Sequence, residues 1–270
     1  MRARGLFLLT AMLAAGGCDY IASPDDLLDP DAISIAMILV AGERQAHLLA
    51  GHPHRTVLEP PPTVTATLVG PGWRAALTHD ADLDDGCGGG PTDWPMPKVC
   101  LNAELPEPIR NEATYRLEGV GPKGSFTGEA VVPAAPTIQA PVDTVWLPGP
   151  QDAIRIPIRY HASAQVGTLR PEVLQTVGGS TGTRSEWVNV IPRNLDVSGR
   201  EETIKWSYER NLQRASLHLL GIGQLYTLYW KLDGTHIPWP KAGVSGNGVY
   251  GYFDGSAKSR PIEIRLKDEG

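Results

Sequence analysis

The stretch that decides the fold is AIRIPIRYH, residues 153–161, in which apolar and polar side chains alternate. The isoleucines and Tyr160 stand at even-numbered positions, and the arginines, the proline and His161 stand at odd-numbered positions. Successive side chains of a β-strand point to opposite faces, so this pattern buries one face and leaves the other in water. Because Pro157 has no N–H to donate to a neighbouring strand, we expect this strand at the edge of a sheet.

The same alternation recurs in TVTATLVG (63–70), ATYRLEGV (113–120) and IEIRL (262–266). Short strands separated by some of the 30 glycines and 24 prolines are typical of antiparallel sandwiches or barrels. The sequence therefore predicts an all-β fold. One segment, GQLYTLYWKLDG (223–234), has leucines at helical spacing and predicts a short helix, although its aromatic residues suit a strand equally well.

A proline-rich stretch, residues 131–150, separates two strand-rich halves. The first half has the size of an immunoglobulin-like sandwich. We therefore expect an N-terminal immunoglobulin-like β-sandwich over residues 32–135 and a proline-rich linker over 136–149. A second, less regular β-rich domain with one short helix is expected over 150–267.

The N-terminus reads MRARGLFLLTAMLAAGGC and resembles a secretory signal. Arg2 and Arg4 precede an apolar run of roughly ten residues, which is too short for a bilayer core that needs about 20. AAGGC resembles the lipobox that precedes an acylated cysteine. We expect a signal peptide over residues 1–17 and a lipidated Cys18, and the alternative is ordinary cleavage that leaves Cys18 a free thiol. An acidic spacer follows over 18–31.

Cys87 and Cys100 are the two remaining cysteines, and they predict one local disulfide bond. Disulfides persist in exported proteins, which agrees with the signal. Two thiols are too few for a zinc site. Together these features predict a cell-envelope protein that is lipid-anchored in the outer or inner membrane and faces the periplasm or the cell surface.

The charge pattern excludes one class of partner. The formal net charge is −6, and no cluster of lysine and arginine stands out along the chain. Binding to a phosphate backbone depends on such a cluster, so nucleic acid is not an expected partner.

Two glycine-rich matches to catalytic motifs are better explained by local structure. Residues 178–182 match G-x-S-x-G, but a nucleophile elbow needs a helix after the turn, and strand-like sequence follows. A hairpin is expected there. Residues 246–251 match G-x-G-x-x-G, but strand-like sequence follows again, so no dinucleotide site is expected. Glycines that allow close packing of aromatic side chains, or a bulge, explain this second match.

An acidic run offers the one metal hypothesis. Asp80, Asp82 and Asp84 alternate and would converge on Ca²⁺ in an irregular loop. The run departs from the EF-hand pattern, because Asp85 stands at the glycine position and Pro91 at the bidentate acid position. A solvated acidic turn beside the disulfide is the alternative, and no other cofactor is expected.

Trp94 and Trp239 each lie in a proline-framed loop, DWPMP and IPWPK. An exposed tryptophan on a stiff loop can stack on a sugar or contact a partner protein. The alternative is that each ring folds back and closes the end of a sandwich. These two residues are the candidate ligand contacts.

Three phrases carry a family resemblance: AISIAMILVAG (32–42), the stretch 113–138 that begins ATYRLEGV, and the stretch 246–266 that begins GNGVYGYF. Their order resembles a domain-of-unknown-function family of exported bacterial β-rich lipoproteins. Members are often encoded beside TonB-dependent receptors and have no assigned enzyme activity. The resemblance implies a cell-envelope location and an outer-membrane receptor as a partner.

From these features we expect a membrane-anchored envelope lipoprotein with a non-catalytic binding or accessory role. Its expected partners are the lipid bilayer, through acylated Cys18, and an envelope protein or glycan. Two alternatives stay open. One is a secreted hydrolase whose site is assembled from residues distant in sequence, and the other is a purely structural envelope protein.

Overall fold

The structure of the chain is a computed structural model. It describes residues 29–53, 58–80, 87, 97–147, 154–177, 180–182, 191–192, 200–206, 212–233 and 241–266. Strands dominate these residues, and one helix, α1 (Gln224–Asp233), lies where the sequence predicts it. The predicted all-β class is confirmed. Among the described residues, no helix is both long enough and apolar enough to cross a membrane.

In chain order, the strands are β1 (Ile33–Val40), β2 (Gln45–Gly51), β3 (Thr65–Gly70), β4 (Trp73–His79), β5 (Lys98–Glu104), β6 (Thr114–Gly121), β7 (Gly124–Val131), β8 (Thr137–Ala140), β9 (Thr144–Leu147), β10 (Ile154–His161), β11 (Val166–Val177), β12 (Ser180–Gly182), β13 (Ile191–Pro192), β14 (Arg200–Trp206), β15 (Leu212–Gly223), β16 (Lys241–Ala242), β17 (Val244–Gly246), β18 (Val249–Lys258) and β19 (Ile262–Leu266).

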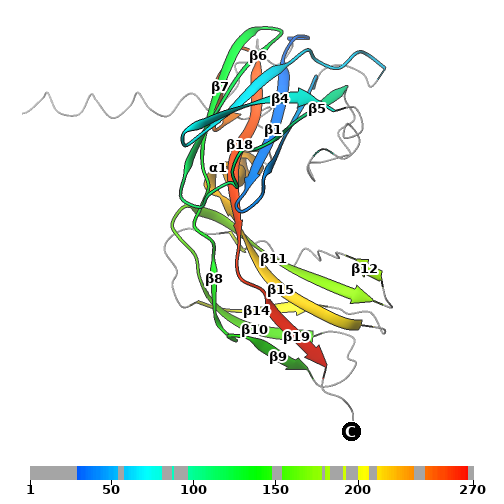
Figure 1. The fold of residues 1–270 in the computed structure, drawn as a ribbon, viewed down its shortest axis with the longest axis vertical. Coiled ribbons are helices and arrows are strands. Elements are labelled where there is room, and N and C mark those ends of the chain that lie inside the picture. The colour runs from blue at the N-terminus through cyan, green and yellow to red at the C-terminus, as the bar shows by residue number, and fades with distance from the viewer. Residues whose placement is uncertain are drawn as a thin grey trace, which may run out of the picture.

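The first sandwich is made by one curled sheet in the order β18-β1-β2-β5-β4-β3-β6-β7-β17. Strand β4 passes between the layers, because it pairs with β5 at Thr78 and His79 and with β3 over the rest of its length. Figure 1 shows this unit above the second one. Alternating side chains such as Leu68, Tyr115 and Leu117 fill the core between the layers. The predicted immunoglobulin-like sandwich is thus present.

A long-range strand pair closes this sandwich. β1 runs parallel to β18, from Ile33 opposite Val249 to Val40 opposite Ser256. Val249 and Phe253 of β18 are buried in the same core as Ile33 and Ile35 of β1. The first sandwich therefore takes strands from both sides of the predicted linker.

Gly251 is the residue that lets β18 lie this close to β1. Its φ is +104°, and a Cβ atom there would lie 1.8 Å from the carbonyl oxygen of Ile35. Gly246 is similarly close to Phe126, because a Cβ would lie 2.8 Å from the Cβ of that residue. The G-x-G-x-x-G match thus leads into strand β18 and serves close packing, as the sequence predicts.

The second sandwich packs the strands β12-β11-β15-β19-β9 against a three-stranded sheet, β14-β10-β8 (Figure 1). Ile156 and Ile158 of β10 meet Leu217 and Leu219 of β15 in its core. β15 pairs with β19 at one end and with β18 at the other, so one strand connects the two sandwiches. Strands β8 and β9 both come from the segment predicted as the linker.

The expectation that residues 153–161 form an edge strand is wrong, because β10 lies between β14 and β8. Pro157 is opposite Thr203 of β14. On the other side β8 pairs only with residues 159–161, across a register shift. Within the described residues, the ladder on that side thus stops before the proline, which is how a central strand accommodates it.

We predict that Gly251→Ala lowers the free energy of unfolding by more than about 4 kcal/mol, since the new methyl group overlaps the backbone of β1. The matched control is Gly42→Ala. Gly42 has a φ of +87°, but a Cβ atom added to it would have no other atom within 4 Å, so only backbone strain of roughly 1 kcal/mol is expected. Chemical denaturation of both variants measures the difference. Equal losses of unfolding free energy in the two variants would contradict the role of the close approach between Gly251 and β1.

Candidate functional site

The outer surface of the second sandwich carries a row of polar side chains that we call the polar face. Its residues alternate in sequence with core residues such as Val173, Leu217 and Ile264, so they point away from the core. The polar face consists of Glu172 on β11, Ser216 and His218 on β15, Glu263 and Arg265 on β19, and Trp146 on β9.

The strand register sets these side chains in rows across the sheet. Glu172 lies opposite His218, and Ser216 lies opposite Glu263. Arg265 lies beside Trp146 across the parallel pair of β19 and β9. With neighbouring strands about 4.8 Å apart, the face extends roughly 14 Å from β11 to β9.

His218 is held by two hydrogen bonds. Its Nδ1 lies 3.4 Å from the carbonyl oxygen of Ser259, and its Nε2 lies 3.3 Å from the hydroxyl of Ser216. Because the carbonyl needs a donor, Nδ1 carries the hydrogen, and Nε2 accepts from the hydroxyl. Burial lowers the pKa of His218, and Lys258 acts in the same direction, while the hydrogen bond to the Ser259 carbonyl and the nearby Glu172 oppose this shift. The imidazole is therefore neutral at pH 7.

The carboxylates of the polar face are paired with cations. Glu172 accepts from Lys258 at 3.3 Å, and Glu263 accepts from Arg265 at 2.9 Å. At the end of the face nearest to α1, burial lowers the pKa of Arg170 to about 10, while Glu172 and Tyr226 act in the opposite direction. The guanidinium therefore stays charged at pH 7.

Trp146 is the aromatic residue of the face, with 53% of its surface exposed. The guanidinium carbon of Arg265 lies 5.7 Å from the centroid of its ring, within the range of a cation–π contact. The neighbouring Val145 packs against the second core, so the side chain of Trp146 points to the opposite, outer face of β9. Sequence reasoning missed Trp146 because it fell in the proline-rich linker. The signal available there was the run of strand-favouring residues, Thr, Val and Trp, in TVWL.

Helix α1 packs against β18 of the first sandwich and against β11 and β15 of the second, and Asp254 of β18 anchors it there. The Asp254 carboxylate accepts from the backbone N–H of Tyr226 at 2.7 Å and of Gly255 at 2.8 Å. Only 2% of Asp254 is exposed, and this burial raises its pKa to about 6. A carboxylate at a helix N-terminus satisfies N–H groups that lack partners within the helix. On its other side, α1 joins β11 through the hydroxyls of Thr227 and Thr168, 2.6 Å apart.

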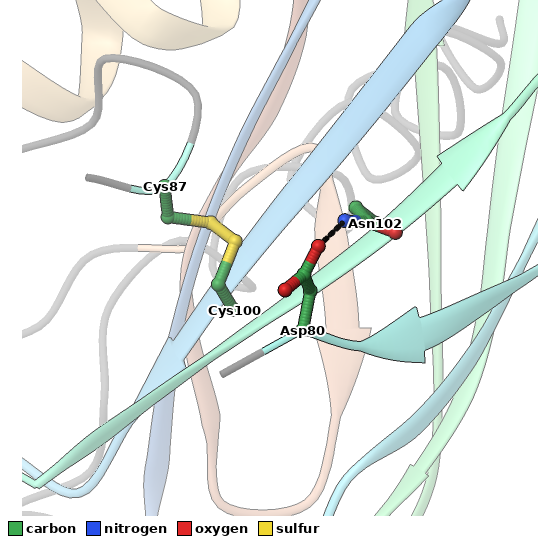
Figure 2. The surroundings of a disulfide bond; sticks show 4 residues. All are labelled: Asp80, Cys87, Cys100 and Asn102. Atoms are coloured by element: carbon green, nitrogen blue, oxygen red, sulfur yellow. Dashed lines mark hydrogen bonds between the residues drawn. A yellow bond between two sulfur atoms is a disulfide. The ribbon is translucent and has the colours of Figure 1, made fainter. Parts of the chain in front are cut away.

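The predicted disulfide is confirmed: Cys87 is bonded to Cys100 of β5, with their Cα atoms 5.5 Å apart (Figure 2). Both cysteines are buried in a small cluster with Tyr252 of β18, and Leu225 and Tyr226 of α1 pack against this cluster. The disulfide therefore supports the same helix that Asp254 anchors.

Of the predicted calcium ligands, the structure describes Asp80. Its carboxylate accepts from the Asn102 amide at 2.9 Å, as Figure 2 shows. Asp82 and Asp84 lie outside the described residues, as do Cys18, Trp94 and Trp239. Within the described part of the chain, no three His, Cys, Asp or Glu side chains gather in a way that would hold a metal ion.

Of the G-x-S-x-G match, the structure describes residues 180–182 as strand β12. β12 pairs antiparallel with the end of β11, so Ser180 lies opposite Val177. His218 lies opposite Glu172, five residues further along the same strand, which is roughly 16 Å away. The backbone positions of Ser180 and His218 are therefore too far apart for a catalytic pair.

The chain matches no known protein family and no curated protein. Its fold is similar to several solved structures. One is the archaellum periplasmic stator protein complex FlaF and FlaG from Sulfolobus acidocaldarius, with 14% identity over 36% of this chain and 87% of that chain and a TM-score of 0.24. Another is the N-terminal Ig1-2 module of the Drosophila receptor protein tyrosine phosphatase DLAR, with 12% identity over 87% and 99% of the chains and a TM-score of 0.30. At these TM-scores the likeness carries no argument about function.

The pKa of Asp254 predicts a pH dependence of stability. Between pH 4 and 6 the folded chain binds a proton that the unfolded chain has released, so this group's contribution to stability falls as the pH rises through that window. The rise from 3.8 to about 6 corresponds to about 3 kcal/mol. We expect Asp254→Asn to remove this dependence in denaturation curves measured from pH 4 to 7.5.

The matched control is Asp143→Asn, since Asp143 is exposed. This variant should keep the wild-type slope between pH 4 and 6. If the unfolding free energy of Asp254→Asn changes with pH in parallel with that of the wild type, burial of Asp254 does not govern stability between pH 4 and 6.

Proposed function

We propose that the chain is a lipid-anchored protein of the bacterial cell envelope that binds a ligand on its polar face without catalysing a reaction. The observation that carries the binding role is the exposed Trp146 beside the Arg265–Glu263 pair. Tryptophan and arginine are enriched among the residues that contribute most to the binding energy of recognition surfaces.

The sequence around Cys18 supports the anchor. Small residues precede this cysteine, and the apolar run before them is too short to span a bilayer. Each buried CH₂ of an acyl chain contributes about 0.8 kcal/mol, so two or more chains give a persistent tether. The Cys87–Cys100 disulfide adds support, because such bonds persist in oxidising compartments. The family resemblance extends the proposal to an outer-membrane receptor that this protein assists.

The geometry of Ser216 and His218 favours binding over hydrolysis. In a serine hydrolase, a carboxylate orients the histidine and stabilises its charged form. Here a backbone carbonyl bonds Nδ1 of His218, and the nearby Glu172 pairs with Lys258. Ser216 also lies within strand β15 instead of on a sharp turn into a helix.

Mass spectrometry of the mature protein isolated from membranes tests the anchor. We expect an N-terminal peptide that begins at Cys18 and carries the mass of two or more fatty chains. Cys18→Ser should abolish that mass increase, and any chain that is cleaved without acylation should leave the membrane fraction.

Ser23→Ala is the control for this experiment, since it changes the adjacent spacer without touching the thiol, and it should remain acylated. A mature N-terminus downstream of Cys18, or an unmodified Cys18, would refute the anchor.

A further inference from the structure

We propose that the first sandwich binds an extended segment of a partner protein, which adds as a β-strand in a groove between β4 and β5. The segment is one in which apolar and polar side chains alternate. This site lies in a different sandwich from the polar face, so it goes beyond the proposed function and does not depend on it.

The groove arises because β4 changes from one layer of the sandwich to the other. Within the described residues, β4 pairs with β5 only at Thr78 and His79, whereas residues 73–77 pair with β3. Figure 2 shows the junction, where the Asp80 carboxylate accepts from the Asn102 amide. From this junction the two strands diverge around an open groove of about 610 Å³. Pockets of roughly 300–1,000 Å³ bury most of a drug-sized ligand, so the groove has room for a few extended residues.

The wall of the groove on the β4 side is a strand edge with which no described strand pairs. At the junction, Asp80 donates its N–H to the carbonyl oxygen of Cys100 at 3.2 Å. Because alternate residues of a strand direct their backbone groups to the same edge, those of Arg74 and Ala76 point into the groove. The same alternation on β5 directs the backbone groups of Glu104 into it from the opposite wall. Open strand edges of this kind are templates for pairing with another extended chain.

The floor of the groove is apolar and made of small side chains. Ala103 and Leu105 belong to the first core, Ala75 packs against that core, and all three line the groove. A strand added beside β4 would point every second side chain toward this floor and the others toward water. The two alanines leave room for apolar side chains larger than their own. The groove therefore favours a segment with alternating apolar and polar residues.

The two walls select a lone extended segment over the edge of a second copy of this chain. A strand that pairs with β4 and reaches Glu104 on the other side has both of its edges occupied. An edge strand of a folded sheet already has a neighbour on one side, so it cannot enter between the walls. The rim carries charges of both signs, including Arg44, Arg74 and Glu104, so charge does not select the segment.

Selection from a phage-displayed library of random octapeptides on the mature, full-length protein in detergent tests this inference. We expect the enriched peptides to share the alternating pattern and their synthetic copies to bind in fluorescence anisotropy. Ala76→Pro should weaken this binding at least about tenfold, because proline removes the N–H that faces the groove and its ring occupies space there. The variant should melt like the wild type, since proline is tolerated where a strand N–H faces an open edge.

Ala76→Ser is the matched control, because it keeps the backbone N–H, and it should bind the peptide like the wild type. Trp146→Ala on the polar face should also bind like the wild type, because the two sites are separate. A synthetic peptide N-methylated at alternate amides should bind at least about tenfold more weakly. This measurement uses the wild-type protein, so it tests the pairing even if Ala76→Pro does not fold.

Four results would overturn the inference. They are a selection that enriches no peptide, unchanged affinity of the peptide for a folded Ala76→Pro, unchanged affinity of the N-methylated peptide, and loss of binding in Trp146→Ala. A dimer that forms with rising protein concentration in sedimentation velocity, and that Ala76→Pro dissociates, would also overturn it. In that case a second copy of the chain would occupy the groove.

Discussion

The parallel pairing of β1 with β18 is the constraint on which the rest of the structure depends. It joins residues that are more than 200 positions apart in the chain, and it brings Val249 and Phe253 into the first core. The opposite face of β18 carries Tyr252, which meets α1, and Asp254, which anchors its N-terminus. The C-terminal end of β18 then pairs with β15. One strand thus closes the first sandwich, holds helix α1 and leads the sheet into the second sandwich.

This continuity gives the polar face a rigid support. β15 belongs to the sheet of both sandwiches, and its residues Ser216 and His218 stand on the side opposite to the second core. Lys258, at the end of β18, pairs with Glu172 of β11 and so connects the first sandwich to the polar face directly. A recognition surface built on strands keeps its side chains in place better than one built on loops. The proposed tether at Cys18 would hold this surface near the membrane.

Local patterns predicted much of the fold. Alternation identified β3, β6, β10 and β19, helical spacing identified α1, and two cysteines in a chain expected to be exported identified the disulfide. The pairing between distant strands could not be predicted, because nothing in GNGVYGYF indicates which strand lies against Gly251. The prolines around Trp146 suggested a linker, yet β9 needs only four residues between them. Asp254 gave no signal in the sequence, since its burial arises from the helix packed over it.

Amide hydrogen exchange of the full-length protein measures the central pairing most directly. If β1 and β18 form one cooperative unit, their amides exchange only through the opening of both strands, with the same and the highest opening free energies in the chain. The account predicts equal, slow exchange for residues 33–40 and 249–256. Fast exchange in β18 beside a protected β1 would contradict it, because the first sandwich would then stand without its C-terminal strand.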